Sequence, residues 1–163
     1  MSMKIIAPIA AGVLLALAGA AQAATKSTTF QVSANVSENC VINASPLNFG
    51  DFDGTNDRFV NSNIAVRCTS GTTFTVALDD GLTGNFTNRR LTGAGPDPLL
   101  YNLYTDAGLS SVWNDSSNLG TGTGAGMGTP VNLTVYGELL ASLNQGQIDG
   151  GAYTDTITAT IVY

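Results

Sequence analysis

Apolar and polar residues alternate in short runs along most of the chain. A period of two places the apolar side chains of a run on one face of an extended strand. No segment of about 12 residues carries apolar residues at helical spacing, and turn residues separate the runs. This pattern predicts an all-β fold, a β-sandwich. The expected strands cover residues 30–36, 40–42, 47–50, 64–68, 74–78, 99–104, 112–113, 131–139 and 157–163.

Two segments rich in glycine interrupt these runs, and we expect both to be long surface loops. The first, residues 83–98, contains several Gly and Pro residues, and the second, residues 120–128, has Gly at every second position. The second segment does not spell the dinucleotide-binding fingerprint, and no helix is expected after it. A phosphate site is therefore not predicted there.

The N-terminal residues have the pattern of a secretory signal peptide. Lys4 precedes an apolar stretch at residues 5–18, and Ala21-Gln22-Ala23 supplies the small residues that signal peptidase recognises. A spanning helix would need about 20 apolar residues, so a membrane anchor is the weaker reading. We expect residues 1–23 to be removed, with cleavage after Ala24 as the alternative. The remaining 140 of 163 residues fit one domain.

Charge and cysteine content narrow the class of protein further. Without Lys4 the chain keeps 5 basic residues against 12 acidic ones, a net charge of −7, and Arg89-Arg90 is its only adjacent basic pair. Nucleic acid is therefore not an expected partner. Cys40 and Cys68 are the two cysteines, and an exported chain without histidine favours a disulfide over a zinc site. Closing this loop should stabilise the fold by roughly 3–4 kcal/mol.

Two runs do not fit an ordinary sandwich. The last run continues to the final residue with no further strand to pair with it, and the first is separated from residues 40–42 only by Ser37-Glu38-Asn39. The first run presents Phe30, Val32, Ala34 and Val36 on one face. The last presents Ile157, Ala159, Ile161 and Tyr163 on one face. The alternation alone leaves open whether residues 30–36 are a strand of this domain or of another molecule.

Six segments together resemble the spore coat protein U domain family, which includes subunits of archaic chaperone–usher pili. They are Cys40 within its alternating segment, Leu47-Asn48-Phe49-Gly50, residues 66–72 followed by 76–79, residues 100–106 with Trp113, Val135-Tyr136-Gly137, and residues 151–157. The resemblance implies an incomplete immunoglobulin-like sandwich that lacks its last strand and is completed by donor-strand exchange.

The resemblance also implies roles for the parts of the chain. After a signal peptide at 1–23, residues 24–36 would be a donor-strand extension, with Phe30, Val32, Ala34 and Val36 as its plugs. Residues 37–163 would be the sandwich domain, with Ile157, Ala159, Ile161 and Tyr163 along the edge of its groove. The expected partners are a periplasmic chaperone, an outer-membrane usher and identical or related subunits, in a rod at the cell surface that supports adhesion and biofilm formation.

No arrangement of residues predicts catalysis or a cofactor. Asp79-Asp80 are adjacent, so their side chains diverge in a strand, and no histidine is present to activate a serine. The acidic segment at 51–57 departs from the calcium-loop pattern and is better read as a polar turn. Trp113 and Tyr101 are expected in the core rather than on a sugar-binding platform. We expect no enzyme, metal or small-molecule substrate, and keep a secreted coat protein and a carbohydrate-binding module as alternatives.

Overall fold

A computed structural model describes residues 23–93, 95–146 and 148–163. The predicted signal peptide therefore lies almost wholly outside the described residues. No helix among them is long and apolar enough to span a membrane. The elements are β1 (Cys40–Ala44), β2 (Arg58–Cys68), β3 (Thr73–Leu78), β4 (Arg89–Leu91), β5 (Leu99–Tyr104), β6 (Gly120–Thr123), β7 (Val131–Leu139), the 3-10 helix η1 (Ala141–Leu143) and β8 (Ala159–Val162).

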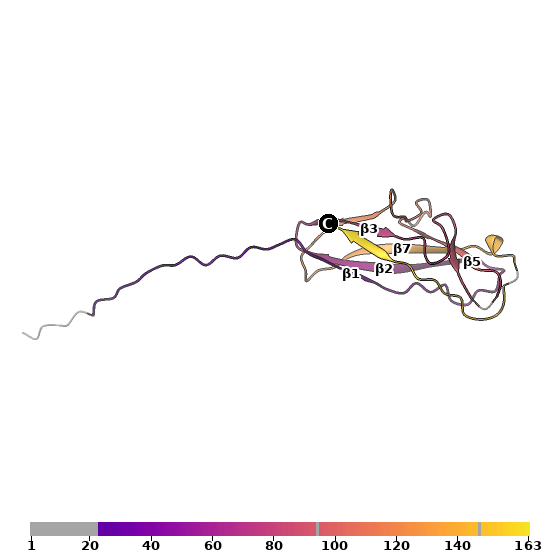
Figure 1. Ribbon diagram of the computed structural model, residues 1–163, viewed down its shortest axis with the longest axis horizontal. Coiled ribbons are helices and arrows are strands. Elements are labelled where there is room, and N and C mark those ends of the chain that lie inside the picture. Colours follow the sequence, from indigo (N-terminus) through magenta and orange to yellow (C-terminus); the bar gives the residue numbers. More distant parts are fainter. Residues whose placement is uncertain (1–22, 94, 147) are drawn as a thin grey trace, which may run out of the picture. The chain divides into compact units, whose positions relative to one another are not determined.

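The strands from β1 onward form two sheets that pack face to face around one core (Figure 1). The first sheet has the order β1-β2-β7-β5-β4, and the second has the order β6-β3-β8. All the pairings are antiparallel. The chain is thus an all-β sandwich, as its alternating pattern predicts.

Alternate residues of the central strands supply the core. Ile64, Val66 and Cys68 of β2 face Phe74, Val76 and Leu78 of β3 from the opposite sheet, and all six are buried. Cys40 and Cys68 are directly opposite each other in the β1–β2 ladder and form the predicted disulfide. The disulfide fixes β1, an edge strand, to the sheet.

The predicted boundaries differ from the structure at the glycine-rich segments. Residues 120–123 form strand β6, and residues 89–91, inside the other expected loop, form β4. Conversely, residues 47–50 form no strand, and Val112 makes only an isolated bridge to Tyr104. The sequence does not predict β6, because its inward positions are Gly120 and Gly122 and no apolar alternation marks it.

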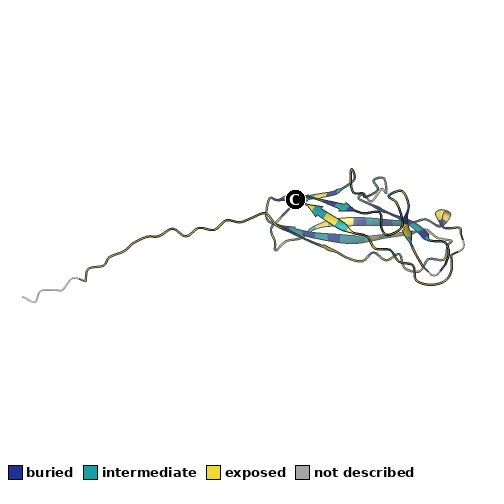
Figure 2. Cartoon of the chain, in the orientation of Figure 1, coloured by how far each residue is buried: buried dark blue, intermediate teal, exposed yellow. Residues whose placement is uncertain are grey.

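Residues 23–39 contain no helix or strand and are exposed throughout (Figure 2). Within this stretch Phe30, Val32 and Val36 are 86%, 82% and 84% exposed. Large apolar side chains at such exposure are unusual for a segment that has reached its final packing. The alternation of residues 30–36 is therefore not accounted for by the core of the described domain.

Candidate functional site

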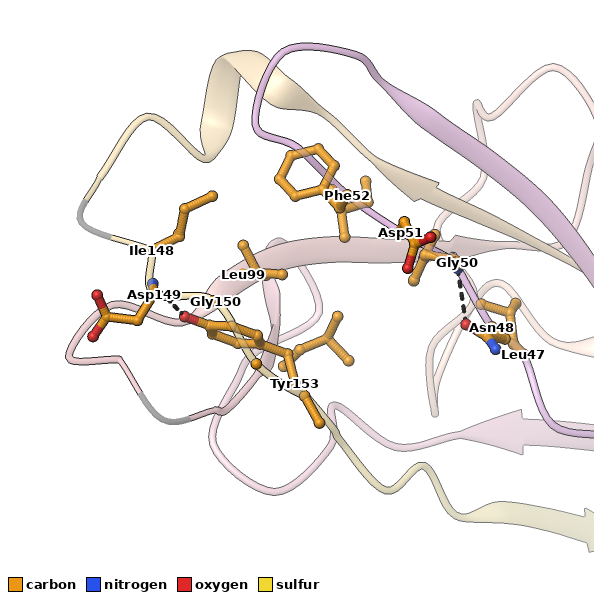
Figure 3. A pocket seen from close by; sticks show the side chains of 15 residues that line it. Leu47, Asn48, Gly50, Asp51, Phe52, Leu99, Ile148, Asp149, Gly150 and Tyr153 are labelled. Carbon is orange, nitrogen blue, oxygen red and sulfur yellow. Dashed lines mark hydrogen bonds between the residues drawn. The ribbon is translucent and has the colours of Figure 1, made fainter.

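A groove opens between the segment that follows β1 and the segment that leads into β8. Two adjoining cavities of about 550 Å³ and about 400 Å³ make up this groove, and Leu47, Phe49 and Leu91 border both. Figure 3 shows the larger cavity, where Phe52, Ile148 and Tyr153 surround the opening. The smaller cavity extends from there toward β8 and reaches residues including Ile64, Leu78, Tyr101, Val135, Asp155, Ile157 and Ala159.

The groove exposes one side of the hydrophobic core. A row of apolar residues packs against the core yet remains only partly buried: Ile42, Leu47, Phe49, Phe52, Leu91, Ile148, Tyr153, Ile157, Ala159 and Ile161. All of them except Ile42 and Ile161 line one or both of the two cavities. Leaving such a row in water forgoes roughly 25 cal/mol for every Å² of apolar surface that a partner would cover.

Two unpaired backbone edges border the same groove. Among the described strands, β1 pairs only with β2, and β8 pairs only with β3. Before β8, Thr154 exchanges two backbone hydrogen bonds with Thr92, and Thr158 accepts one from Asp79 N–H at 3.1 Å. These residues face β3 and β4, so the odd-numbered residues between them direct their backbone groups to the free edge. An extended chain placed here would find hydrogen-bonding partners.

One polar pair interrupts the apolar lining. The Tyr101 hydroxyl donates to Asp155 Oδ2 at 2.7 Å, and Asp155 Oδ1 accepts from Leu82 N–H at 3.0 Å and Thr156 N–H at 2.7 Å. Burial, followed by the hydrogen bond to Asp155, raises the pKa of the Tyr101 hydroxyl. Phe49, which borders both cavities, packs edge-on against the Tyr101 ring with centroids 5.8 Å apart, and the Tyr101–Asp155 pair lines the smaller cavity.

The sequence-predicted site residues fall into two groups. Ile157 and Ala159 line the smaller cavity, and Ile161 packs against the core beyond it. Tyr163, past the end of β8, is 53% exposed and lies outside both cavities. Phe30, Val32, Ala34 and Val36 all lie in the exposed segment before β1.

The aromatic pair considered for sugar binding is buried. Trp113 is 1% exposed, its indole N–H donates to the Val76 carbonyl at 2.9 Å, and Tyr101 lies on the groove floor. Neither ring is free to stack on a sugar at the surface. In the acidic segment, Asp53 accepts the backbone N–H groups of Thr55 and Asn56, and these hydrogen bonds lower the pKa of its carboxyl group. This is the polar turn that the sequence favoured.

Sequence reasoning missed most of the groove lining. The sequence predicts Leu47 and Phe49 in a strand, Leu91 in a loop and Tyr101 in the core, but none of them in a site. Tyr153 and Asp155 belong to the family-like segment 151–157, and the sequence does not indicate that Asp155 pairs with Tyr101. The alternation of Tyr153, Asp155 and Ile157 with threonines and Ala152 was available as a signal. A charged residue in the apolar row concealed it.

Comparison with known proteins agrees with this architecture. Residues 26–160 match the family model of the Spore Coat Protein U domain. Protein U of Myxococcus xanthus is 32% identical over 179 aligned positions, which cover 97% of this chain and 96% of that protein.

A solved structure has a similar fold. It is the pre-assembly complex of the chaperone CsuC with the tip adhesion subunit CsuE of archaic chaperone–usher Csu pili from Acinetobacter baumannii. The TM-score is 0.57 at 23% identity, over 78% of this chain and 40% of that one. The predicted immunoglobulin-like class of the sandwich is thereby confirmed.

Proposed function

Because the chain belongs to the Spore Coat Protein U domain family, we propose that it is an exported structural subunit of an archaic chaperone–usher pilus. The groove carries this proposal. Within the part of the chain that the structure describes, it combines an apolar row that is only partly covered with two backbone edges that have no partner strand. One added strand would satisfy both needs, because strand addition supplies main-chain hydrogen bonds and side chains for the pockets together.

The occupant of the groove in the polymer is residues 30–36 of a neighbouring copy. This segment has four residues, Phe30, Val32, Ala34 and Val36, that project to one face of an extended strand. It is exposed and unpaired in the described structure, so it is available for donation. Each copy then gives one strand and receives one, which builds a head-to-tail rod.

Assembly of this kind requires protection before polymerisation. An apolar groove with free strand edges is an aggregation hazard in a free monomer. A periplasmic chaperone would fill the groove first, and an outer-membrane usher would exchange it for the donor strand. The signal-peptide pattern of residues 1–23 fits export into that compartment. The rod at the cell surface would support adhesion and biofilm formation.

The test compares substitutions on the two faces of the donor segment. Val32→Asp places a carboxylate where an apolar plug enters the groove, and burying an unpaired charge costs several kcal/mol. Gln31→Asp places the same charge on the other face and is the matched control. We expect Val32→Asp to abolish surface polymer while leaving the chaperone-bound monomer intact, and Gln31→Asp to leave both. Loss of the chaperone-bound monomer with Val32→Asp would show that the strand belongs to the subunit's own core.

The description of the family, Spore Coat Protein U domain, favours a second candidate, a secreted coat protein. Copies could join by the same strand exchange and be deposited as a layer instead of a filament. Adjacent genes for a chaperone and an usher, together with filaments in electron micrographs, would support the pilus over the coat.

A further inference from the structure

The polar pair on the groove floor divides the row of residues that an incoming strand would meet. Along the β8 side, the inward positions are Tyr153, Asp155, Ile157 and Ala159 in that order. Asp155, with its hydroxyl donor Tyr101, stands between an aromatic position and an aliphatic one. A large apolar side chain pressed onto this pair would displace water from the carboxylate without offering a hydrogen bond, which is unfavourable. A small side chain avoids that cost.

The two ends of the domain determine the direction of the incoming strand. Cys40, at the start of β1, is opposite Cys68, and Val162, at the end of β8, is opposite Thr75. Both therefore lie near the short connection between β2 and β3, and Figure 1 shows the start of β1 and the C-terminus at the same end of the sandwich. The chain's own extension leaves from that end.

A donor running antiparallel to β8 places its own domain at the opposite end of the groove. The array can then continue as an open chain, because each subunit gives a strand at one end and receives its neighbour at the other. A parallel donor would bring the neighbouring domain to the end from which the extension leaves, where the two would compete for space. We therefore take the antiparallel direction.

The spacing of side chains leaves three registers to compare. Directly opposite residues of an antiparallel pair point to the same face, so the donor's even-numbered residues face the odd-numbered residues of the β8 side. If Ala34 faces Asp155, then Val32 faces Ile157 and Phe30 faces Ala159. A shift by two residues in one direction puts Val32 on Asp155, and in the other direction it puts Val36 there.

Only the first register matches size and polarity along the whole row. It places the smallest plug, Ala34, on the polar pair, and the largest, Phe30, opposite the smallest wall residue, Ala159. Val36 then reaches Tyr153 at the larger cavity. Both alternatives put a valine on the carboxylate, and both move the Phe30 ring opposite an isoleucine, either Ile157 or Ile161.

We propose that Tyr101 and Asp155 set the register of the donor strand by accepting only a small residue, so that Ala34 of the neighbouring copy faces Asp155. This inference rests on the proposed donor-strand function and specifies its geometry. Ala34 is a small apolar plug, and in this proposal its small size determines which donor residue faces Asp155.

The register can be measured with pairs of cysteines, one on the donor segment and one on the β8 side, because only residues directly opposite each other can form a disulfide. In the proposed register Ser33 is opposite Thr156 in a non-hydrogen-bonded pair, with Cα atoms about 4.5 Å apart. We would place Ser33→Cys in the full-length chain with Thr154→Cys, Thr156→Cys or Thr158→Cys, and boil surface polymer in detergent without reductant. Thr156→Cys should give a covalent ladder. The other two should not, because diagonal neighbours are about 7–8 Å apart, beyond disulfide reach.

The outcomes separate the register from the function. A ladder with Thr154→Cys or Thr158→Cys, or polymer without any ladder, overturns the register and leaves strand exchange standing. A cross-link confined to monomer means that the segment occupies its own groove, which overturns both. Absence of polymer from the unaltered chain, produced with its chaperone and usher, overturns the proposed function itself.

A size exchange provides an independent measurement. Ala159→Phe fills the space assigned to Phe30, and overpacking of this kind should reduce polymer roughly tenfold or more. Adding Phe30→Ala should restore polymer, because the two side chains face each other only in the proposed register. Rescue by Val32→Ala instead, with none from Phe30→Ala, would contradict the assignment.

Discussion

Strand β6 offers a direct test of how the sandwich is packed. A β-carbon added at Gly120 would lie 2.4 Å from Trp113 Cζ2 and 2.9 Å from Leu133 Cδ1. The indole cannot easily retreat, because Trp113 is fully buried and its N–H is bonded to the Val76 carbonyl. Gly120→Ala must therefore either shift the strand or displace the ring.

The expected cost follows from these contacts. Overpacking a well-packed core typically costs about 1–3 kcal/mol, and weakening the indole hydrogen bond adds about 1 kcal/mol. We expect Gly120→Ala to lower the free energy of unfolding by roughly 2–3 kcal/mol, enough to lower Tm by about 8–12 °C in a domain of this size. Gly128→Ala is the matched control, since an added β-carbon there meets nothing within 4 Å.

The measurement is thermal unfolding of both variants in the same assembled form, followed by circular dichroism. Gly128→Ala should be neutral or slightly stabilising, because alanine restricts the unfolded chain. Hydrogen exchange should also show slow exchange for the paired amides of β6 and fast exchange for residues 125–128. If Gly120→Ala proves as mild as Gly128→Ala, the close packing of β6 on Trp113 is wrong.

Two further predictions concern buried polar groups. Arg89 is fully buried and donates to the Asp79 and Trp113 carbonyls and to Asn102 Oδ1, so Arg89→Lys should leave acceptors unpaired and cost about 2 kcal/mol or more in chemical denaturation. The same substitution at the exposed neighbour, Arg90→Lys, should hardly change the free energy of unfolding. Equal losses of stability in the two variants would refute the role of the Arg89 guanidinium group. Because the pKa of Tyr101 is raised in the folded state, its contribution to stability is complete below about pH 10 and declines above it, by at most about 1.4 kcal/mol per pH unit. Tyr101→Phe should therefore make the free energy of unfolding fall less steeply with pH above about pH 10. An unchanged dependence on pH would contradict this role of Tyr101.

The central strands could be read from the sequence because their side chains report burial on one face. Residues 64–68 and 74–78 alternate regularly, and the structure buries the predicted faces of both. The disulfide was also predictable, because two cysteines in a chain with a signal-peptide pattern leave few alternatives. Alternation does not show which strands pair, because β2 pairs with β7 and β3 pairs with β8 across long stretches of chain.

Arg89 and the glycines of β6 show a second limit of sequence reasoning. The sequence shows Arg89 only as part of the basic pair Arg89-Arg90. In the structure its guanidinium group donates hydrogen bonds to the backbone carbonyls of Asp79 and Trp113. In the sequence Gly120 and Gly122 indicate a loop, but in the structure their lack of side chains makes room for Trp113 and Phe74. In both cases the residue is explained by a neighbour distant in sequence.

The groove illustrates why a binding site can be half visible in a sequence. The two sets of residues that we propose to meet there, the donor plugs and the row before the C-terminus, are apolar residues at a period of two, so alternation indicates both. The wall formed by Leu47 and Phe49 has the same spacing but no strand geometry in the structure, because its edge lacks a partner among the described residues. Asp155 interrupts the opposite wall, and its meaning depends on Tyr101, 54 positions earlier. If a strand of another molecule completes the sheet, as we propose, part of the alternating pattern is missing from the chain itself. The polar residue that interrupts the pattern is then where specificity for the incoming strand would reside.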